Sequence, residues 1–407
     1  MSELSYLEKL LDGAEVEWVA LNKLATFLKG KSLPKEKITP DGNRYCIHYG
    51  ELFTHYGPII DKVCSKTNQA INESILSEKN DVLMPTSDVT PRGLATASCI
   101  QESGVILGGD ILIIRCSGVD GRYLSNFIIN NKKKILQMVK GSTVYHLYAK
   151  DIGKLLIPIP CPNNPEKSLA IQSEIVRILD KFTALTAELT AELSMRKKQY
   201  NYYRDQLLSF KEGEVEWKTL GEVAQYSKTR ISFELLDERN YVGVDNLLQN
   251  RAGKSLSNHV PTSGKLTEFI PNDILIGNIR PYLKKIWQAD CIGGTNGDVL
   301  VIRCIDSSIN TRYLYQILAD DKFFEYNMQH AKGAKMPRGS KEDIMKYPIP
   351  VPPLTLQARI VEILNKFDTL TNSITEGLPR EIELRQKQYE YYRDLLFSFP
   401  KPETVSN

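Results

Sequence analysis

The sequence predicts a mixed fold of the α+β or α/β class, with two globular domains separated by two long antiparallel coiled-coil helices. Three observations lead to this prediction. The 407 residues are enough for two or three domains, a helical segment occurs twice, and the blocks between its copies share strand and helix patterns. Hydrophobic residues at 42% and charged residues at 25% are typical of a folded globular protein. We therefore expect one repeat unit, present twice about a pseudo-two-fold axis.

The helical segments are the clearest part of the repeat. Residues 171–186 read IQSEIVRILDKFTALT, and residues 356–371 read LQARIVEILNKFDTLT. Further along, RKKQYNYYRDQLLSF at 196–210 returns as RQKQYEYYRDLLFSF at 385–399. In both copies apolar residues recur at alternating steps of four and three, which is the heptad seam of a coiled coil. The two segments are therefore expected to pack against each other.

This periodicity predicts helices over residues 168–210 and 354–398. Gly377 and Pro379 are poor residues for a helix interior, so a kink or a restart is expected there. Packing between the two helices explains most of the seam. Exposed positions beside the seam are either solvated faces or sites for another protein.

A tandem tetrapeptide interrupts the first seam, because TAEL at residues 186–189 is repeated at 190–193. A four-residue insertion keeps the seam nearly in phase and adds ~6 Å of helix at 1.5 Å per residue. The segment is therefore interpreted as a spacer whose length can change without loss of packing.

The N-terminal region belongs to the same repeat, because EVEWVALNKLA at residues 15–25 matches EVEWKTLGEVA at 214–224. The start of the chain thus supplies what should follow the second helical copy. The repeat is circular, and the two termini are expected to lie close together on one side of the pseudo-two-fold axis.

The two blocks between the helical copies are diverged relatives. DILIIRC at residues 110–116 parallels DVLVIRC at 298–304, and RYLSNFI at 122–128 parallels RYLYQIL at 312–318. The first pair predicts strands and the second pair predicts short helices. The expected segments are an N-terminal piece completing the second repeat (1–19), a first domain (20–157), a central helical spacer (158–218), a second domain (219–347), and a C-terminal helical spacer with a tail (348–407).

Composition excludes several classes of protein. The apolar runs are strand-sized, so no membrane span is expected, and the acidic N-terminal segment does not resemble an export signal. Seven cysteines without a Cys-x-x-Cys pair indicate neither a disulfide framework nor a zinc site, and a reducing cytoplasm fits this usage. The net charge of +3 conceals an excess of +6 over residues 20–157 and +2 over 219–347.

The sequence contains no complete catalytic motif of the kinds considered below. Gly-Lys-Ser at residues 30–32 and 253–255 lacks the earlier glycine of a phosphate-binding loop. The five histidines show no metal-ligand spacing, and no Gly-x-Ser-x-Gly elbow occurs. Acid-x-Lys triplets at 216–218 and 320–322 arise often by chance. We therefore expect no catalytic residue, no metal and no cofactor in this chain.

Two related basic blocks at a fixed separation suit recognition of two separated elements on double-stranded DNA, with cations at phosphates and polar side chains at base edges. The base-reading candidates of the first block are His48, Tyr49, Glu51, Thr54, His55, Thr86, Ser87, Asp88, Thr90 and Arg92. Its phosphate-binding candidates are Lys132, Lys133, Lys134 and Lys140. The candidates of the second block are Asp245, Asn246, Asn278, Arg280, Tyr282, Lys284, Lys285, Lys332, Lys335, Arg338, Ser340 and Lys341. Ordinary turn or surface roles are the alternative for each residue taken singly.

The circular repeat, the QY-x-YYRD-LL-SF helix ends, the TAEL quartets and the GEVEW-x-x-LGE joint resemble the specificity subunit of type I restriction-modification enzymes. The TAEL form is similar to the type IC subgroup. The resemblance covers essentially the whole chain and is most specific over residues 1–25, 155–224 and 347–407. The two globular blocks match only in their framework.

The resemblance implies that residues 20–157 and 219–347 are target recognition domains. Each would read one half of an interrupted DNA sequence, the N-terminal domain taking the 5′ part. Two modification subunits would bind S-adenosylmethionine and methylate adenine, and restriction subunits would translocate and cleave DNA with ATP and Mg²⁺. In related subunits the number of TAEL quartets sets the gap between half-sites.

Two alternatives come from other classes of function. The first is a protein-interaction adaptor that holds two copies of a partner without reading DNA. The second is an enzyme with a hidden nuclease site. The bases of the target do not follow from the sequence.

Overall fold

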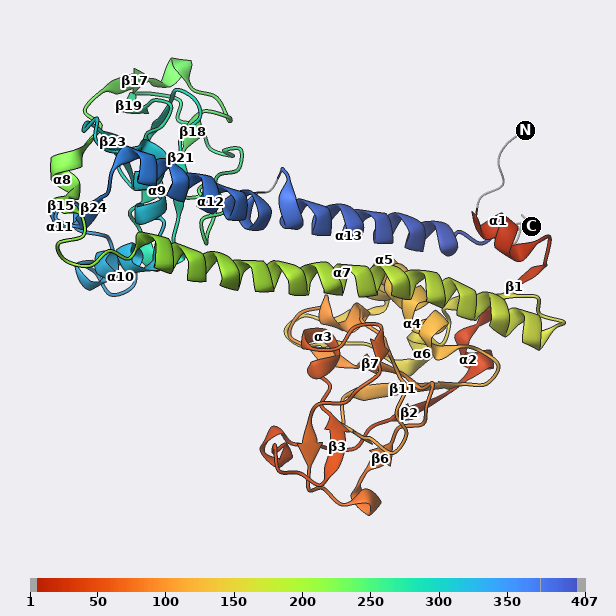
Figure 1. The fold of residues 1–407 in the computed structure, drawn as a ribbon. Helices are drawn as coiled ribbons and strands as arrows, with labels where there is room; N and C mark the ends of the chain where they lie inside the picture. The colour runs from red at the N-terminus through yellow and green to blue at the C-terminus, as the bar shows by residue number, and fades with distance from the viewer. Residues whose placement is uncertain (1–5, 374, 401–407) are drawn as a thin grey trace. The chain divides into compact units, whose positions relative to one another are not determined.

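The structure, a computed structural model, describes residues 6–373 and 375–400, which form two compact units (Figure 1). The first unit holds the described residues up to Leu185 together with those from Gln386 onward, and the second holds Thr186–Arg385. Each unit combines one globular domain with parts of the long helices. In the described part of the chain, no helix has the length and the apolar character needed to cross a membrane.

The domain of the first unit is built from four small sheets and short helices. The main sheet has the order β2 (Ala25–Lys29), β11 (Ile111–Cys116), β7 (Val82–Pro85), β9 (Ser98–Ile100), β4 (Ile59–Ile60). A second sheet has the strand order β5 (Lys66–Thr67), β3 (Arg44–Ile47), β10 (Ile106–Leu107), β6 (Ile75–Leu76). A third has the order β12 (Lys140–Gly141), β13 (Tyr145–His146), β8 (Ser87–Asp88). In the fourth, β1 (Val16–Ala20) pairs with β14 (Leu156–Pro160). The helices are α1 (Tyr6–Leu11), α2 (Leu21–Leu24), α3 (Glu51–Thr54), α4 (Gly121–Asn130), α5 (Lys132–Met138) and α6 (Ala149–Ile152).

Strand β11 divides the core of this domain into two. Its four aliphatic residues from Ile111 to Ile114 are all buried, as expected for a short continuous apolar run in a central strand. Because side chains alternate along a strand, Leu112 and Ile114 face the cluster that includes α4, whereas Ile111 and Ile113 face a second cluster under β3 and β10. The strand expected at 110–116 and the helix expected at 122–128 are confirmed.

The domain of the second unit repeats this plan. Its main sheet has the order β16 (Ala224–Tyr226), β23 (Val299–Cys304), β20 (Ile274–Gly277), β21 (Ile286–Gln288). A second sheet has the strand order β17 (Arg230–Ser232), β19 (Lys265–Phe269), β22 (Gly293–Thr295), β18 (Tyr241–Val242). In a third sheet β15 (Glu216–Thr219) pairs with β24 (Pro348–Val351). The helices are α8 (Leu220–Val223), α9 (Thr311–Leu318), α10 (Asp321–Gln329) and α11 (Lys341–Ile344). Leu300 and Ile302 of β23 face one core cluster, and Val299 and Val301 face the other.

The long helices confirm the repeat and the expected interruption of its second copy. Helix α7 (Pro165–Leu208) is continuous for 44 residues, including both TAEL quartets. The restart expected at Gly377 and Pro379 within residues 354–398 is also found, because α12 (Leu354–Asn372) ends before α13 (Gly377–Leu396) begins. Gly377 has a φ of +79°, and a Cβ there would lie 2.4 Å from the Thr369 carbonyl oxygen, so glycine is needed at this restart.

Within each unit the helices run antiparallel and meet through aromatic side chains. In the first unit the rings of Phe182 and Tyr392 stack with centroids 5.2 Å apart. In the second unit Tyr200 stacks on Phe367 at 5.8 Å. The seam loosens toward the TAEL quartets, where the predicted seam residue Leu185 is 37% exposed.

The circular joint is visible in the first unit. Strand β1 pairs with β14 so that Trp18 lies opposite Pro158, just as Trp217 lies opposite Pro350 in the second unit. The Trp18 Nε1 donates a hydrogen bond of 2.6 Å to the carbonyl oxygen of Pro400, which joins the two ends of the described chain. The termini, which were expected to lie close together, are outside the described residues.

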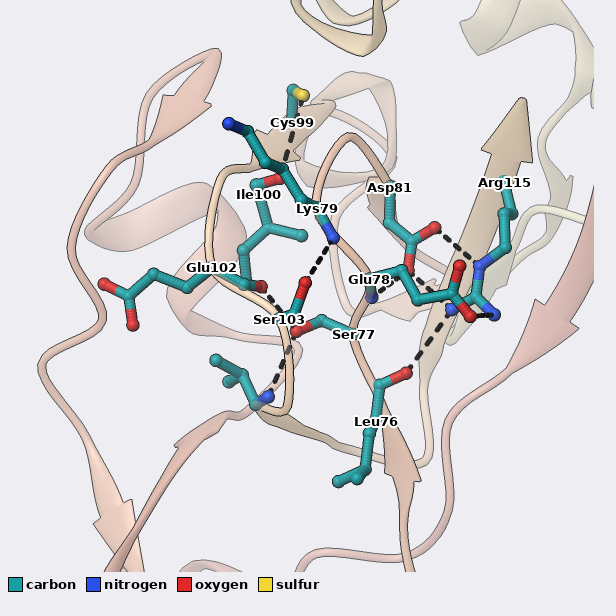
Figure 2. Close-up of polar contacts among 11 residues, drawn as sticks. Leu76, Ser77, Glu78, Lys79, Asp81, Cys99, Ile100, Glu102, Ser103 and Arg115 are labelled. Carbon is teal, nitrogen blue, oxygen red and sulfur yellow. Dashed lines mark hydrogen bonds and ion pairs between the residues drawn. The ribbon is translucent and has the colours of Figure 1, made fainter. Parts of the chain in front are cut away.

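A buried ion pair ties the end of β11 to the loop before β7. Figure 2 shows the Arg115 guanidinium between the carboxylates of Asp81 and Glu78. Asp81 accepts two hydrogen bonds of 2.8 Å from Arg115, and its side chain is 1% exposed. Arg303 and Asp273 make the same bidentate pair in the second unit.

Replacing Asp81 by alanine should destabilise the first domain. The Asp81→Ala change leaves a partly buried guanidinium without its inner partner, and we expect the free energy of unfolding to fall by about 3 kcal/mol. Urea denaturation of the full chain measures this. Glu78→Ala is the matched control, because Glu78 is 64% exposed and should contribute less than about 1 kcal/mol. Equal effects of the two changes would contradict the assignment.

Candidate nucleic-acid interface

The structure brings the two polar stretches of the first domain together. Helix α3 and the turn after β8 touch through Phe53, because a Cβ on Gly93 would lie 3.4 Å from the Phe53 ring and 2.4 Å from the Asp88 carboxylate. Helix α5 contacts the Gly93–Ala95 turn. Burial, and then the nearby Arg92 guanidinium, lower the pKa of Lys132 at the start of α5. Segments 48–55, 86–93 and the start of α5 therefore form one surface, which we call the first polar surface.

Glu51 organises the first stretch from within. Its Oε2 accepts a hydrogen bond of 2.7 Å from the His48 backbone N–H, and its Oε1 accepts one of 2.5 Å from the Ser65 hydroxyl. Both carboxylate oxygens are thus used inside the domain. Glu51 therefore holds the turn in shape, and a contact between Glu51 and a base stays a prediction.

His48 presents a neutral ring on this surface. Burial, and then the nearby Lys35 ammonium, lower the pKa of His48. Its Nδ1 accepts a hydrogen bond of 3.2 Å from the Gly50 N–H, which leaves Nε2 as the protonated nitrogen. The ring lies 4.4 Å from that of Tyr49. The pair offers one donor beside an aromatic face.

The turn after β8 is built by its own aspartate. Asp88 accepts hydrogen bonds of 2.7 Å from the Val89 N–H and 2.8 Å from the Thr90 hydroxyl. Ser87 lies opposite His146, which in turn lies opposite Lys140 across the small sheet. The exposed candidates of this domain are Thr54, His55, Thr90, Arg92, Lys133, Lys134 and Lys140, and the half-buried ones are His48, Tyr49, Glu51, Thr86, Ser87, Asp88 and Lys132.

In the second domain two candidate loops distant in sequence lie side by side. The Arg280 N–H donates 2.7 Å to the Pro337 carbonyl oxygen, and the Gly339 N–H donates 3.1 Å to that of Asn278. Lys332 and Arg338 exchange two backbone hydrogen bonds of 2.9 Å, which closes the basic loop as a hairpin. We call loop 278–285 and hairpin 332–341 together the second polar surface.

The backbone of loop 278–285 is held in an unusual conformation. Arg280 and Lys284 have φ values of +53° and +51° on either side of a short 3-10 turn. Such left-handed conformations cost of order 1–3 kcal/mol for residues with side chains and are found most often at functional sites. Here they leave the Arg280 and Tyr282 side chains exposed. The other exposed candidates of this domain are Asp245, Lys332, Lys335, Arg338 and Lys341.

Several candidates of the second domain have local structural partners. The Arg338 guanidinium pairs with Asp298 at 2.5 Å, and Lys284 pairs with Asp321 at 2.7 Å. The Ser340 hydroxyl caps helix α11 by accepting a hydrogen bond from the Asp343 N–H. These contacts position the loops, although Arg338 keeps about half of its side chain exposed.

Three candidates are corrected because their side chains are buried. Asn246 accepts a hydrogen bond from the Gly243 N–H and donates to the carbonyl oxygens of Tyr241 and Ser255. Lys285 donates to the Val244 carbonyl oxygen. Asn278 lies under the hairpin. None of these three side chains is exposed at the surface, because other segments of the chain cover them.

Sequence reasoning missed one loop that supports the second polar surface. The Asn250 and Arg251 N–H groups donate 3.0 Å hydrogen bonds to the carbonyl oxygens of Leu283 and Lys284. Arg251 also pairs with Asp321 beside Lys284. The sequence of this loop, QNRAGK at residues 249–254, has the composition of a turn, but no local pattern indicates which other loop it contacts.

Both polar surfaces combine cations, hydroxyls and aromatic rings. Such groups can bind phosphates, stack on bases and hydrogen-bond to base edges. Among residues 6–373 and 375–400, no cluster of histidine, cysteine and carboxylate side chains could hold a metal ion. The arrangement is suited to binding a polyanion.

Comparisons with known proteins agree on one family. Residues 14–195 and 212–384 match the family described as the type I restriction modification DNA specificity domain. The chain is 40% identical to the type I restriction enzyme EcoR124I/EcoR124II specificity subunit of Escherichia coli over 100% of both chains, and 33% identical to the EcoprrI specificity subunit over 92% of this chain and 93% of that protein. The fold is similar to that of the type I restriction-modification S subunit from M. genitalium, with a TM-score of 0.59 and 16% identity over 96% of this chain and 98% of that one.

Gly339 should be essential for the shape of the second polar surface. A Cβ there would lie 2.2 Å from the Asn327 side-chain oxygen and 2.8 Å from that of Asn278, both buried. We expect Gly339→Ala to destabilise the hairpin by about 1–3 kcal/mol through overpacking. Hydrogen exchange at the Arg280 and Gly339 amides should then quicken. Gly297→Ala, at a glycine with open space around it, is the control. Unchanged protection in Gly339→Ala would contradict this packing.

Proposed function

Because this chain belongs to the type I restriction-modification DNA specificity family, we propose that its two domains each read one half of an interrupted DNA site. The first polar surface would contact one half-site, and the second polar surface the other. The assembly of exposed cations and aromatic rings from separate loops, once in each domain, is the observation that supports this proposal. Since the target is chromosomal or invading DNA, the working place of the chain would be the cytoplasm.

Affinity and specificity would come from different residues. Exposed lysines on α5 and on the hairpin would bind phosphates, and their contribution would weaken with salt. Arg280, fixed by its left-handed backbone, and Arg92 would donate to base edges, where arginine commonly pairs with guanine. Tyr282 and the His48 ring would add contacts with bases.

The chemistry of the system would lie in other subunits. We propose that modification subunits bind S-adenosylmethionine and methylate adenine, and that restriction subunits use ATP and Mg²⁺. This chain would bind DNA and hold two modification subunits in place. The two antiparallel helix pairs would supply the surface for that assembly.

Salt dependence tests the proposal directly. Filter binding of the purified chain to random duplexes should show an affinity that falls steeply between low and moderate salt, because bound phosphates release counterions. Absence of salt-sensitive DNA binding would instead favour a protein-interaction adaptor. Cutting of DNA by the chain alone in Mg²⁺ would favour a nuclease.

The length of α7 should set the gap between half-sites. A third TAEL inserted after Leu193 adds ~6 Å of helix, which lies between one and two base-pair rises of ~3.4 Å. We expect the preferred gap to grow by one or two base pairs, as measured by mapping methylated adenines in a host that carries the variant. Thr190→Ser keeps the helix length and should keep the gap. An unchanged number of base pairs between the half-sites after the insertion would refute the spacer role.

Arg280→Ala should impair reading of one half-site only. We expect a loss of about 1–3 kcal/mol of discrimination in that half, since a base-edge contact is removed. Competition between duplexes altered in one half-site or the other measures this. Lys335→Ala should weaken binding to all duplexes alike. A uniform loss in Arg280→Ala would make Arg280 a phosphate contact.

A further inference from the structure

The two halves differ at one pair of equivalent tryptophans. Trp18 donates its Nε1–H to the Pro400 carbonyl oxygen at 2.6 Å and packs 6.3 Å from the Phe127 ring. Trp217 holds the same place on its ladder, opposite a proline of β24. Its side chain is 43% exposed, and its Nε1 has no hydrogen-bond partner among the described residues.

The space beside Trp217 is unfilled, whereas the equivalent space beside Trp18 in the first unit is occupied by side chains. In the first unit Phe397 lies 5.5 Å from both Tyr123 and Phe127, and it is buried. By the alignment of the repeats, Leu208 takes the place of Phe397 and Ile317 that of Phe127. These smaller side chains leave a hollow of about 290 Å³. We call it the Trp217 hollow, and its lining also includes Phe210, Tyr347 and Pro350.

The second unit also exposes an apolar residue whose equivalent is covered in the first unit. In the first unit Leu7 and Leu11 of α1 belong to the cluster that buries Ile171, which is 5% exposed. The equivalent of Ile171 in the repeat is Leu356, and it is 39% exposed. Between Leu208 and β15 the described chain forms no helix that could play the part of α1.

We propose that the Trp217 hollow is a docking site for a segment of the modification subunit that inserts a large apolar side chain. The first unit supplies the template for such a ligand: an aromatic ring in the place of Phe397, followed by a backbone carbonyl that accepts a hydrogen bond from the indole. The choice of partner rests on the proposed function. The location and chemistry of the site rest on the comparison of the two units.

Other occupants fit less well. DNA is disfavoured because the lining is mostly apolar and carries no excess of positive charge: its one cation, Lys322, is balanced by Asp320, which is buried as the cap of α10. A second copy of this chain is disfavoured because its matching groups, Phe397 and the α1 leucines, are buried in its own first unit. A different polypeptide is therefore the occupant.

The hollow can be filled by introducing the phenylalanines that occupy the equivalent positions of the first unit. Leu208→Phe combined with Ile317→Phe places the first unit's side chains in the second unit, so the fold should be kept. In titration calorimetry of the full chain with purified modification subunit, we expect one of the two proposed binding events to weaken at least tenfold and the other to stay unchanged. Affinity for random duplexes should not change. Leu256→Phe combined with Ile305→Phe, the same changes at exposed positions, is the matched control.

A second variant tests the same site in case the double variant Leu208→Phe, Ile317→Phe is unstable. Trp217→Phe keeps an aromatic ring and removes the indole donor, and we expect a several-fold weakening of the same single binding event with an unchanged melting temperature. If the filled variant folds and binds like the wild type, or if Trp217→Phe binds like the wild type, the docking site is refuted. If the wild-type chain itself binds no modification subunit, the proposed function fails instead.

Discussion

The structure depends on one buried amide in each helical copy that fixes where the helix meets its domain. The Gln172 side-chain oxygen accepts a 3.0 Å hydrogen bond from the Asp120 N–H, and the Gln357 oxygen accepts one of 2.8 Å from the Asn310 N–H. Both glutamines are fully buried, so sliding the helix by a residue would leave unpaired groups at about 1–3 kcal/mol each. Helix position, and with it the position of each polar surface, is thereby fixed within its unit.

The helix that returns to each domain is fixed in the same way. The Tyr200 hydroxyl donates to the Gln316 side chain at 3.0 Å, and the Tyr389 hydroxyl donates to that of Asn126 at 3.4 Å. Beneath these contacts the tyrosines of α4 and α9 reach the proline strands, with Tyr123 donating to Pro158 and Tyr313 to Pro350. Because these equivalent contacts occur in both units, the two domains can differ in their surfaces while the helices engage each domain through matching positions.

The sequence was sufficient for the architecture because a duplicated chain provides its own comparison. Strands β11 and β23 could be predicted because a short unbroken aliphatic run, rich in β-branched residues, favours a buried strand. Individual surface residues could not, because the groups that bury Asn246 and Lys285 come from backbone distant in sequence or in an adjoining loop. Nor could the contact between Arg280 and Pro337 be foreseen, since pairing of irregular loops leaves no periodic signal.

The circular arrangement also explains why the halves are unequal. In the second unit the joint between helix and β15 is covalent, whereas in the first unit Trp18 and Pro400 meet across 382 residues. Closing a loop of that length costs roughly 5 kcal/mol in chain entropy. Burial of a leucine or phenylalanine returns about 1.5–3 kcal/mol, so Leu7, Leu11, Phe397 and Phe399 together offset that cost. The covalent joint needs no such cover, which leaves the apolar surface around Trp217 free to receive another chain.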